Sequence, residues 1–397
     1  MNLETILSPK NTKPEPSVPE ILDLQTEKDC RRLEHLSDEG KIKHSVDDYR
    51  EQLLEYFQVT NPSLVYHVDF NEKFKTFVQT IESVTPLWKH GRWVYFPWIS
   101  TAVHLLEDEH FQLVRTARNK NLINAEEQRV FYTSCIGIGG LSVGNSVALA
   151  LVLQGGAKHI RLADHDALAL SNLNRIRAGV DSLGLPKIEM TARQIYLLNP
   201  YATVEIFTEG LTRENIEKFF AGPPKLDLVV DELDNLAVKF LIREQAQKNH
   251  VAVVMAADNG DNAVVDIERY DLDAHTPFFH GRMGDALSYE MLAGLDKFGI
   301  GKMITKHVGP ENVTERMQQS LLEMGKTIVS WPQLGGAALV SGAAVAYCVR
   351  KILNKQELEG NRSLISMDEK LIPNFNAPEK IEQKQQIAAS FKKIFGL

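Results

Sequence analysis

Polar and charged side chains in the middle of the chain have the types and spacing of a nucleotide-binding site. In chain order, the residues that we expect to contribute are Gly137, Gly139, Gly140, Asp164, Asn172, Arg175, Lys187, Asp234 and Asn235. Glycines between a strand and a helix let the backbone approach a phosphate, and the free N–H groups at the helix start attract negative charge. The same loop also fits a tight strand-to-helix turn that binds nothing.

The groups that follow the glycines favour ATP over NAD. Asp164 lies 25 residues after Gly139, where an acidic side chain accepts hydrogen bonds from ribose hydroxyls in either kind of site. Asn172, Arg175 and Lys187 then supply an amide and two cations. Phosphate oxygens need such donors as negative charge shifts during displacement, whereas a dinucleotide site has less need of them.

Carboxylates that follow an apolar run at 226–230 predict a magnesium site. Asp231 and Asp234 stand where a parallel sheet presents its carboxyl edge to ligands. We expect Asp234 to hold Mg²⁺ between phosphates. Asp234 and Asn235 also fit the N-cap of a helix, and the two roles are compatible.

From about residue 128, apolar runs of strand length alternate with segments of helical spacing. Strands are expected at 130–136, 159–163, 204–207, 226–230 and 251–255, and helices at 142–154, 187–198 and 235–248. This alternation predicts an α/β fold with a doubly wound, mostly parallel, Rossmann-like sheet. Residues 264–270 fit an antiparallel continuation of that sheet.

The flanking regions predict a small N-terminal α+β domain and a C-terminal extension. The expected divisions of the chain are 1–20 (proline-rich and disordered), 21–111 (the α+β domain), 112–355 (the nucleotide-binding domain) and 356–397 (the extension). Strands are expected at 64–70 and 92–96, and a helix over 101–118. Residues 294–330 fit either a mobile lid or a surface excursion, and 334–353 fit a core or dimer-contact helix.

Composition narrows the class of protein. Lys and Arg number 44 against 52 Asp and Glu, and the net charge of −8 argues against a general nucleic-acid surface. We find neither an apolar run of about 20 residues, as a membrane span needs, nor a secretory signal, and therefore expect a cytoplasmic protein. The cysteines, Cys30, Cys135 and Cys348, contain no Cys-x-x-Cys pair, so we expect neither disulfides nor zinc, and expect Cys135 and Cys348 to be buried.

Residues 112–355 resemble the ThiF/MoeB/HesA superfamily, the adenylating enzymes related to ubiquitin activators. The resemblance is carried by the glycine loop, Asp164, the run from Ser171 to Arg175, Lys187 and the Asp234-Asn235 pair. It implies that the glycine loop and Asp164 hold ATP, that Arg175 and Lys187 bind phosphates, and that Asp234 holds Mg²⁺. It also implies a homodimer in which an arginine, here Arg118, reaches the phosphates from the other subunit. A surface position on a helix is the alternative for Arg118.

Two departures from the superfamily pattern shape the functional expectation. No cysteine lies between Cys135 and Cys348, so a thioester step is in doubt, and the paired Cys-x-x-Cys motifs of a structural zinc site do not occur. The added N-terminal domain resembles that of peptide-modifying members of the microcin and pantocin type, where such a domain can clamp a substrate peptide.

Three hypotheses follow for the function. The first is ATP-dependent adenylation of a carboxylate on a precursor peptide, in peptide natural-product biosynthesis, with an internal amide or another nucleophile capturing the acyl group. The second changes the substrate to a sulfur-carrier or ubiquitin-like protein that ends in Gly-Gly. The third is an NAD-binding oxidoreductase or a nucleotide-sensing module, which leaves Asn172, Arg175 and Lys187 unexplained.

Overall fold

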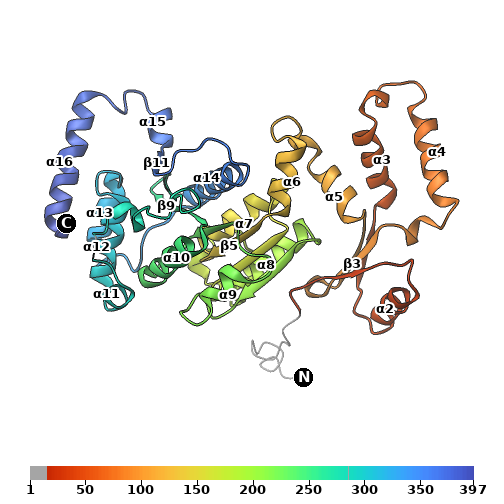
Figure 1. Cartoon of the computed structure of the whole chain (residues 1–397), viewed down its shortest axis with the longest axis horizontal. Helices are drawn as coiled ribbons and strands as arrows, with labels where there is room; N and C mark the ends of the chain where they lie inside the picture. Colours follow the sequence, from red (N-terminus) through yellow and green to blue (C-terminus); the bar gives the residue numbers. More distant parts are fainter. Residues whose placement is uncertain (1–15, 285) are drawn as a thin grey trace. The chain divides into compact units, whose positions relative to one another are not determined.

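The computed structural model describes residues 16–284 and 286–397, and it divides into two compact units, Met1–Leu122 and Ile123–Leu397 (Figure 1). Most of the segment that we expected to be disordered, residues 1–20, lies outside the described residues. The two units are presented separately below.

The N-terminal unit is an α+β fold around a four-stranded sheet of order β1-β3-β4-β2. Its strands are β1 (Glu20–Leu22), β2 (His44–Asp47), β3 (Arg92–Phe96) and β4 (Thr101–Leu105), and its longer helices are α2 (Glu27–Asp38), α3 (Tyr49–Thr60), α4 (Phe70–Glu82) and α5 (Asp108–Arg115). Apolar faces of α3 and α4 build the larger of its cores, where Leu53, Phe57 and Phe74 are buried together. The expected strand at 92–96 is confirmed.

Two expectations for this unit are wrong. Residues 64–70 form a turn and the start of α4 instead of a strand, because the alternating Tyr66 and Val68 are 99% and 91% exposed and have no sheet to face. The expected helix over 101–118 is divided into β4, α5 and the short helix η4 (Ala117–Asn119). The buried Ala102 and His104 alternate with partly exposed neighbours along β4, which is the period of a strand.

The C-terminal unit is built on a seven-stranded sheet of order β11-β10-β9-β8-β5-β6-β7, and this confirms the expected fold class. The strands are β5 (Cys135–Gly139), β6 (His159–Ala163), β7 (Thr203–Phe207), β8 (Leu228–Asp231), β9 (Ala252–Asn259), β10 (Asn262–Glu268) and β11 (Arg362–Ile365). Strands β5 to β9 pair in parallel, and β10 and β11 are antiparallel. Residues 130–133, which we expected in the first strand, end helix α6 (Ala125–Thr133) instead.

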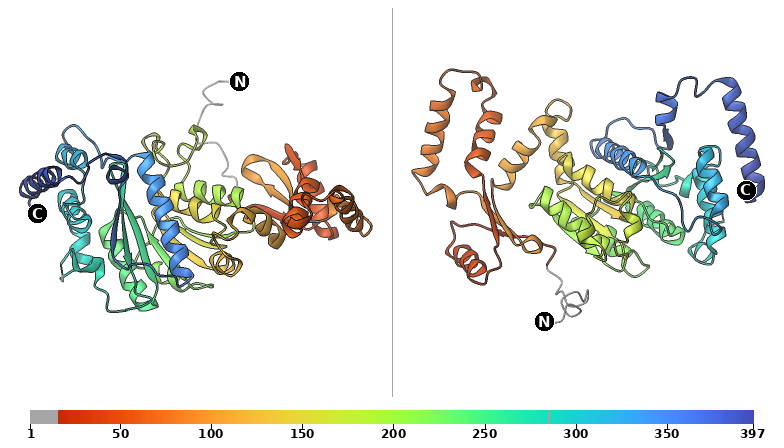
Figure 2. Two further views of the ribbon diagram at one scale, coloured as in Figure 1. Left: turned by 90° about the horizontal axis from the view of Figure 1, so that it is seen from above. Right: turned by 180° about the vertical axis from the view of Figure 1, so that it is seen from behind.

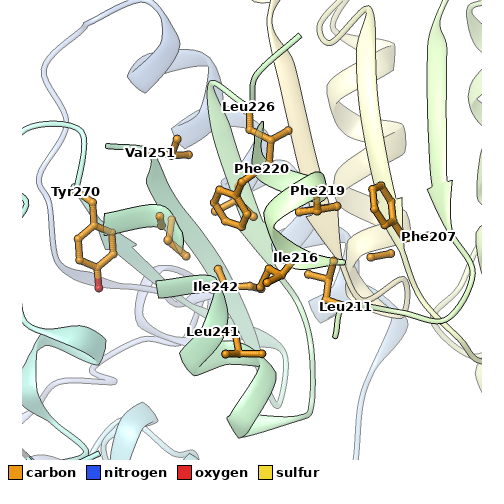
Figure 3. Close-up of a cluster of buried hydrophobic side chains, with 14 of the residues drawn as sticks. Phe207, Leu211, Ile216, Phe219, Phe220, Leu226, Leu241, Ile242, Val251 and Tyr270 are labelled. Carbon is orange, nitrogen blue, oxygen red and sulfur yellow. The ribbon is translucent and has the colours of Figure 1, made fainter. Parts of the chain in front are cut away.

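Helices cover both faces of this sheet, as a doubly wound topology requires (Figure 2). One face carries α7 (Val143–Leu153), α8 (Lys187–Leu198) and α14 (Gly335–Leu353), and the other carries α9 (Ile216–Ala221) and α10 (Leu236–Asn249). Phe219, Phe220 and Ile242 pack from α9 and α10 onto the sheet (Figure 3). From β5 the chain adds β6 and β7 on one side, and it then returns to add β8 on the other side of β5. The order of the strands therefore reverses between β5 and β8.

The segment after β10 forms helices α11 (Tyr289–Ala293), α12 (Lys297–Val308) and α13 (Glu315–Glu323). Helix α11 packs against α10, whereas α12 and α13 pack against the last helix, α16 (Pro378–Phe395). Helix α14 is long and apolar enough to cross a membrane, but half of that stretch is buried, and α14 packs on α7, β9 and β10. The small residues of α14 permit this close packing: a Cβ at Gly342 would lie 2.8 Å from the backbone of Ser146 in α7.

A buried ion network ties the end of β8 to α10. The Asp231 carboxylate accepts hydrogen bonds from Arg243 and lies 3.1 Å from the Lys239 ammonium, and Arg243 also pairs with Glu268 of β10 at 2.7 Å. Asp231 and Arg243 are fully buried. Burial alone would raise the pKa of Asp231, but the charges of Lys239 and Arg243 outweigh burial and lower it.

Arg243→Met tests the importance of this network. Because the substitution leaves Asp231 and Glu268 buried without their guanidinium partner, we expect the free energy of unfolding to fall by about 3–5 kcal/mol in urea titrations. Lys248→Met, on the same helix as Arg243, is the control, since it breaks an exposed ion pair with Glu217 of α9 and should cost at most about 1 kcal/mol. Equal losses in the two variants would contradict a structural role for the buried network.

Candidate nucleotide site

The glycine loop follows β5 and is held against the loop that follows β8. Gly140 has φ of +83°, and a Cβ there would lie 2.3 Å from the Glu232 carbonyl oxygen, so only glycine fits without a shift of the backbone. The Gly140 N–H donates to the Ala163 carbonyl at 2.8 Å. This close approach fixes the loop at the point where the sheet changes direction and where α7 begins.

Asp164 joins the glycine loop to the chain beyond β6. Its two carboxylate oxygens accept hydrogen bonds from the N–H groups of Leu141 (2.7 Å) and Asp166 (2.8 Å), and the residue is buried. The expected ribose contact would use the remaining lone pairs of this carboxylate. Because the N–H groups of Gly140 and Leu141 are already bonded within the protein, the backbone donors left for a phosphate are those at the start of α7.

Arg175 reaches the start of α7 from the segment after β6. Its Nε donates to the Ser142 hydroxyl at 2.9 Å, and its Nη1 donates to the Asn174 side-chain oxygen and to the Ser171 carbonyl. Burial lowers the pKa of Arg175, against the opposing charges of two carboxylates, Asp234 and Asp258. The guanidinium therefore stands between the helix start and the acidic end of the neighbouring strands.

Lys187 begins α8 and is anchored by a residue that the sequence analysis did not select. Its ammonium lies 2.8 Å from a carboxylate oxygen of Asp166, and its N–H donates to the Asp166 carbonyl. The hydrogen bond from Lys187 lowers the pKa of Asp166. Since Asp166 also donates its N–H to Asp164, one short loop links the carboxylate expected at the ribose to the ammonium expected at the phosphates.

Asp234 and Asn235 open α10 at the same edge of the sheet. The Asn235 side chain accepts from the N–H groups of Ala237 and Val238, which confirms the N-cap alternative for Asn235. Asp234 is exposed to solvent, and none of the described residues donates a hydrogen bond to its carboxylate. Desolvation by the surrounding protein raises the pKa of Asp234, against the charges of Lys239, Lys187 and Arg175.

These groups fit ATP and Mg²⁺. An open carboxylate at Asp234 is the kind of oxygen ligand that Mg²⁺ takes together with phosphates and water. Arg175 and Lys187 both act electrostatically on Asp234, so cations and carboxylate belong to one site. The side-chain oxygen of Asn172 caps its own turn by accepting a hydrogen bond from the Ala169 N–H, and its contact with a nucleotide stays a prediction.

The sequence analysis did not select two charged residues near this edge, because neither belongs to a sequence motif. Lys239 lies on α10 and is buried, with its ammonium 3.1 Å from Asp231. Asp258, near the end of β9, is 7% exposed and accepts hydrogen bonds from Ser341 and Gln333. Lys239 could have been selected from the sequence, because it lies on the helix that begins just after Asp234. Asp258 could not, because only the pairing of β9 with β8 brings it to this edge of the sheet.

Arg118 and two cysteines complete the predicted groups. Arg118 is exposed in η4 of the N-terminal unit, and its role at the phosphates stays a prediction. Cys135 and Cys348 are buried as expected, and burial raises the pKa of each thiol to about 11. At such values a thiol is a poor nucleophile at neutral pH.

Residues 115–285 match the ThiF family. The chain contains a ThiF family domain. Over 318 residues the chain is 36% identical to an uncharacterized protein, MT1398, of Mycobacterium tuberculosis (strain CDC 1551 / Oshkosh). The aligned stretch covers 80% of this chain but only 44% of that relative. The chain thus spans less than half the length of this relative.

The chain is also similar to other proteins over shorter stretches or at lower identity. Over 150 residues, 38% of this chain and 51% of the relative, it is 28% identical to the sulfur carrier protein adenylyltransferase of Thermus thermophilus. Among solved structures, E. coli MccB with AMPCPP and MccA is 18% identical, with a TM-score of 0.45 and coverage of 64% of this chain and 68% of that chain. E. coli tRNA N6-threonylcarbamoyladenosine dehydratase TcdA is 17% identical, with a TM-score of 0.42 and coverage of 61% and 94%.

Gly140→Ala tests the glycine loop. The added methyl group clashes with the Glu232 carbonyl and forces a shift where Arg175 meets α7, so we expect ATP affinity, measured by calorimetry, to fall at least about tenfold. Gly325→Ala is the control, because Gly325 also has positive φ, +77°, but a Cβ there meets nothing within 4 Å. Unchanged ATP affinity in Gly140→Ala would show that the close approach is unrelated to nucleotide binding.

Proposed function

We propose that the ThiF family domain activates a carboxylate with ATP and Mg²⁺, forming an acyl-adenylate and pyrophosphate. The observation that carries the proposal is the shared electrostatic neighbourhood of Arg175, Lys187 and Asp234 beside the start of α7. Two cations and an open carboxylate suit a triphosphate with its metal better than the pyrophosphate of a dinucleotide. The similarity to an adenylyltransferase of Thermus thermophilus supports the same chemistry.

Each group has a distinct task in the proposed reaction. Asp164 binds the ribose, and Asn172 and Asn235 border the nucleotide. Arg175 and Lys187 neutralise the phosphate oxygens, which lets a carboxylate approach the α-phosphorus and stabilises the charge that develops as pyrophosphate leaves. Mg²⁺ held by Asp234 would supply further charge neutralisation on the departing phosphates.

The proposed substrate is a carboxylate on a precursor peptide, in peptide natural-product biosynthesis. The proposal rests on the separate N-terminal unit, which is available to hold a peptide, and on the buried, weakly acidic thiols of Cys135 and Cys348, which disfavour a thioester step. The match to the sulfur carrier protein adenylyltransferase favours a second candidate, a small carrier protein ending in Gly-Gly. We further propose a cytoplasmic homodimer, in which Arg118 is contributed across subunits.

Chromatography of the nucleotide products tests the reaction. Purified protein incubated with ATP, Mg²⁺ and either candidate peptides or a carrier protein ending in Gly-Gly should release AMP and pyrophosphate. Asp234→Asn and Lys187→Ala should lower that rate by about 10²–10³-fold, because each removes a charge that stabilises the departing pyrophosphate. Mass spectrometry of the two classes of acceptor identifies which carboxylate is activated.

Asp181→Asn and Lys225→Ala are matched controls, because both residues are exposed and no hydrogen bond or ion pair of the described residues joins either of them to a site group. They should leave AMP formation unchanged. Release of ADP in place of AMP would mean that an acyl phosphate is formed. Tighter binding of NADH than of ATP would contradict adenylation and support an NAD-binding protein.

A further inference from the structure

Asp258 is a buried carboxylate that the adenylation step does not use. It lies near the carboxyl end of β9, four residues beyond Val254, just as Asp234 lies four residues beyond Val230 in β8, and Val230 and Val254 are paired. Parallel strands bring such positions to the same edge of a sheet. Asp258 thus belongs to the edge that carries the proposed nucleotide site.

A chain of hydrogen bonds connects Asp258 to Arg175. Gln333 donates its side-chain amide to Asp258 at 3.4 Å and accepts at its carbonyl from the Asn174 amide at 2.8 Å. Asn174 in turn accepts from the Arg175 guanidinium at 2.9 Å. Two residues, Gln333 and Asn174, thus link this carboxylate to the cation that is proposed to bind phosphate.

The immediate partners of Asp258 leave its carboxylate basic. Ser341 of α14 donates its hydroxyl to one oxygen at 2.8 Å, and the Gln333 amide donates to the other. Both donors are neutral, in contrast to the cations that pair with Asp166 and Asp231. A carboxylate has about four lone-pair sites, so two such bonds leave room to accept a proton from an incoming group.

Burial has the largest effect on the pKa of Asp258. Burial raises the pKa of Asp258, against the hydrogen bonds from Ser341 and Gln333 and the charge of Arg175. Glu232, from the end of β8, is a charged neighbour of Asp258. A carboxylate whose pKa is moved toward neutrality is better matched to take up a proton during a reaction near pH 7.

We propose that Asp258 is the general base that activates an amine to capture the acyl-adenylate, an inference that rests on the proposed adenylation. The amine nitrogen attacks the carbonyl carbon, and a C–N bond forms. The bond between that carbon and the oxygen of AMP breaks, and AMP leaves with the electron pair. The proton lost by the nitrogen passes to the Asp258 carboxylate, so the products are an amide and AMP.

This assignment also explains how acyl transfer proceeds without a cysteine at the site. An enzyme that forms a thioester stores the acyl group on a thiol, whereas direct capture needs a base beside the adenylate.

The test supplies the adenylate chemically and so bypasses the ATP-dependent step. Full-length protein is mixed with synthetic acetyl-adenylate and either glycinamide, an amine that needs a base, or hydroxylamine, which is uncharged at neutral pH and attacks without one. Asp258→Asn should lose about 10²-fold or more of the glycinamide acceleration, while the hydroxylamine rate equals that of the wild-type protein.

Ser341→Ala is the matched variant, since it removes a hydrogen bond to Asp258 but keeps the carboxylate. Because that bond favours the ionised form, its loss should move the acidic limb of the glycinamide profile to higher pH and leave the rate at high pH near that of the wild-type protein. This shift tests the proposal even if Asp258→Asn does not fold.

Three results would overturn the assignment: no glycinamide acceleration by the wild-type protein, equal acceleration by Asp258→Asn, or an unshifted pH profile in Ser341→Ala. None of these depends on ATP. Failure of adenylation itself would instead appear as absence of AMP formation from ATP, whatever the outcome with acetyl-adenylate.

Discussion

The positions of the site residues at the carboxyl edge of the sheet depend on one buried carboxylate whose negative charge is balanced by two cations. Asp231 ends β8 with its side chain fully buried, and the charges of Lys239 and Arg243 keep it ionised there. Both cations come from α10, so strand and helix are locked together on either side of the connecting loop. That loop carries Glu232 and Asp234, and its position is therefore fixed from both ends.

The other loops of the site are held in place by their contacts with this loop and with one another. The Glu232 carbonyl leaves no room for a side chain at Gly140, and the carboxylate of Asp164 ties the glycine loop to the chain after β6. Asp166 then holds Lys187 at the start of α8. Three loops from β5, β6 and β8 thus brace one another before any ligand is bound, which reduces the entropy lost when a nucleotide is positioned.

The sequence predicts those parts of the fold in which local pattern and tertiary environment agree. The strand at 159–163 and the helix at 187–198 were expected at the bounds that β6 and α8 have, because apolar periodicity there reflects real burial. The strand expected at 64–70 fails for the opposite reason: Tyr66 and Val68 alternate without any surface to pack on. Among the site groups, those in a contiguous motif were found, whereas Asp258 required knowledge of which strands are neighbours.

Three aspartates near this edge show how one side chain acquires different properties from its surroundings. Asp231 meets two buried cations and is held ionised as a structural tie. Asp234 faces solvent beside Lys187 and Arg175, with its oxygens open to a metal ion. Asp258 is buried among neutral donors, and its burial raises its pKa against their hydrogen bonds. Desolvation raises the pKa of Asp234 as well, so the division of roles that we propose rests on what each carboxylate contacts. The exposed carboxylate of Asp234 is open to a metal ion, whereas that of Asp258 is held by Ser341 and Gln333, which suits the first to metal-assisted activation and the second to proton transfer.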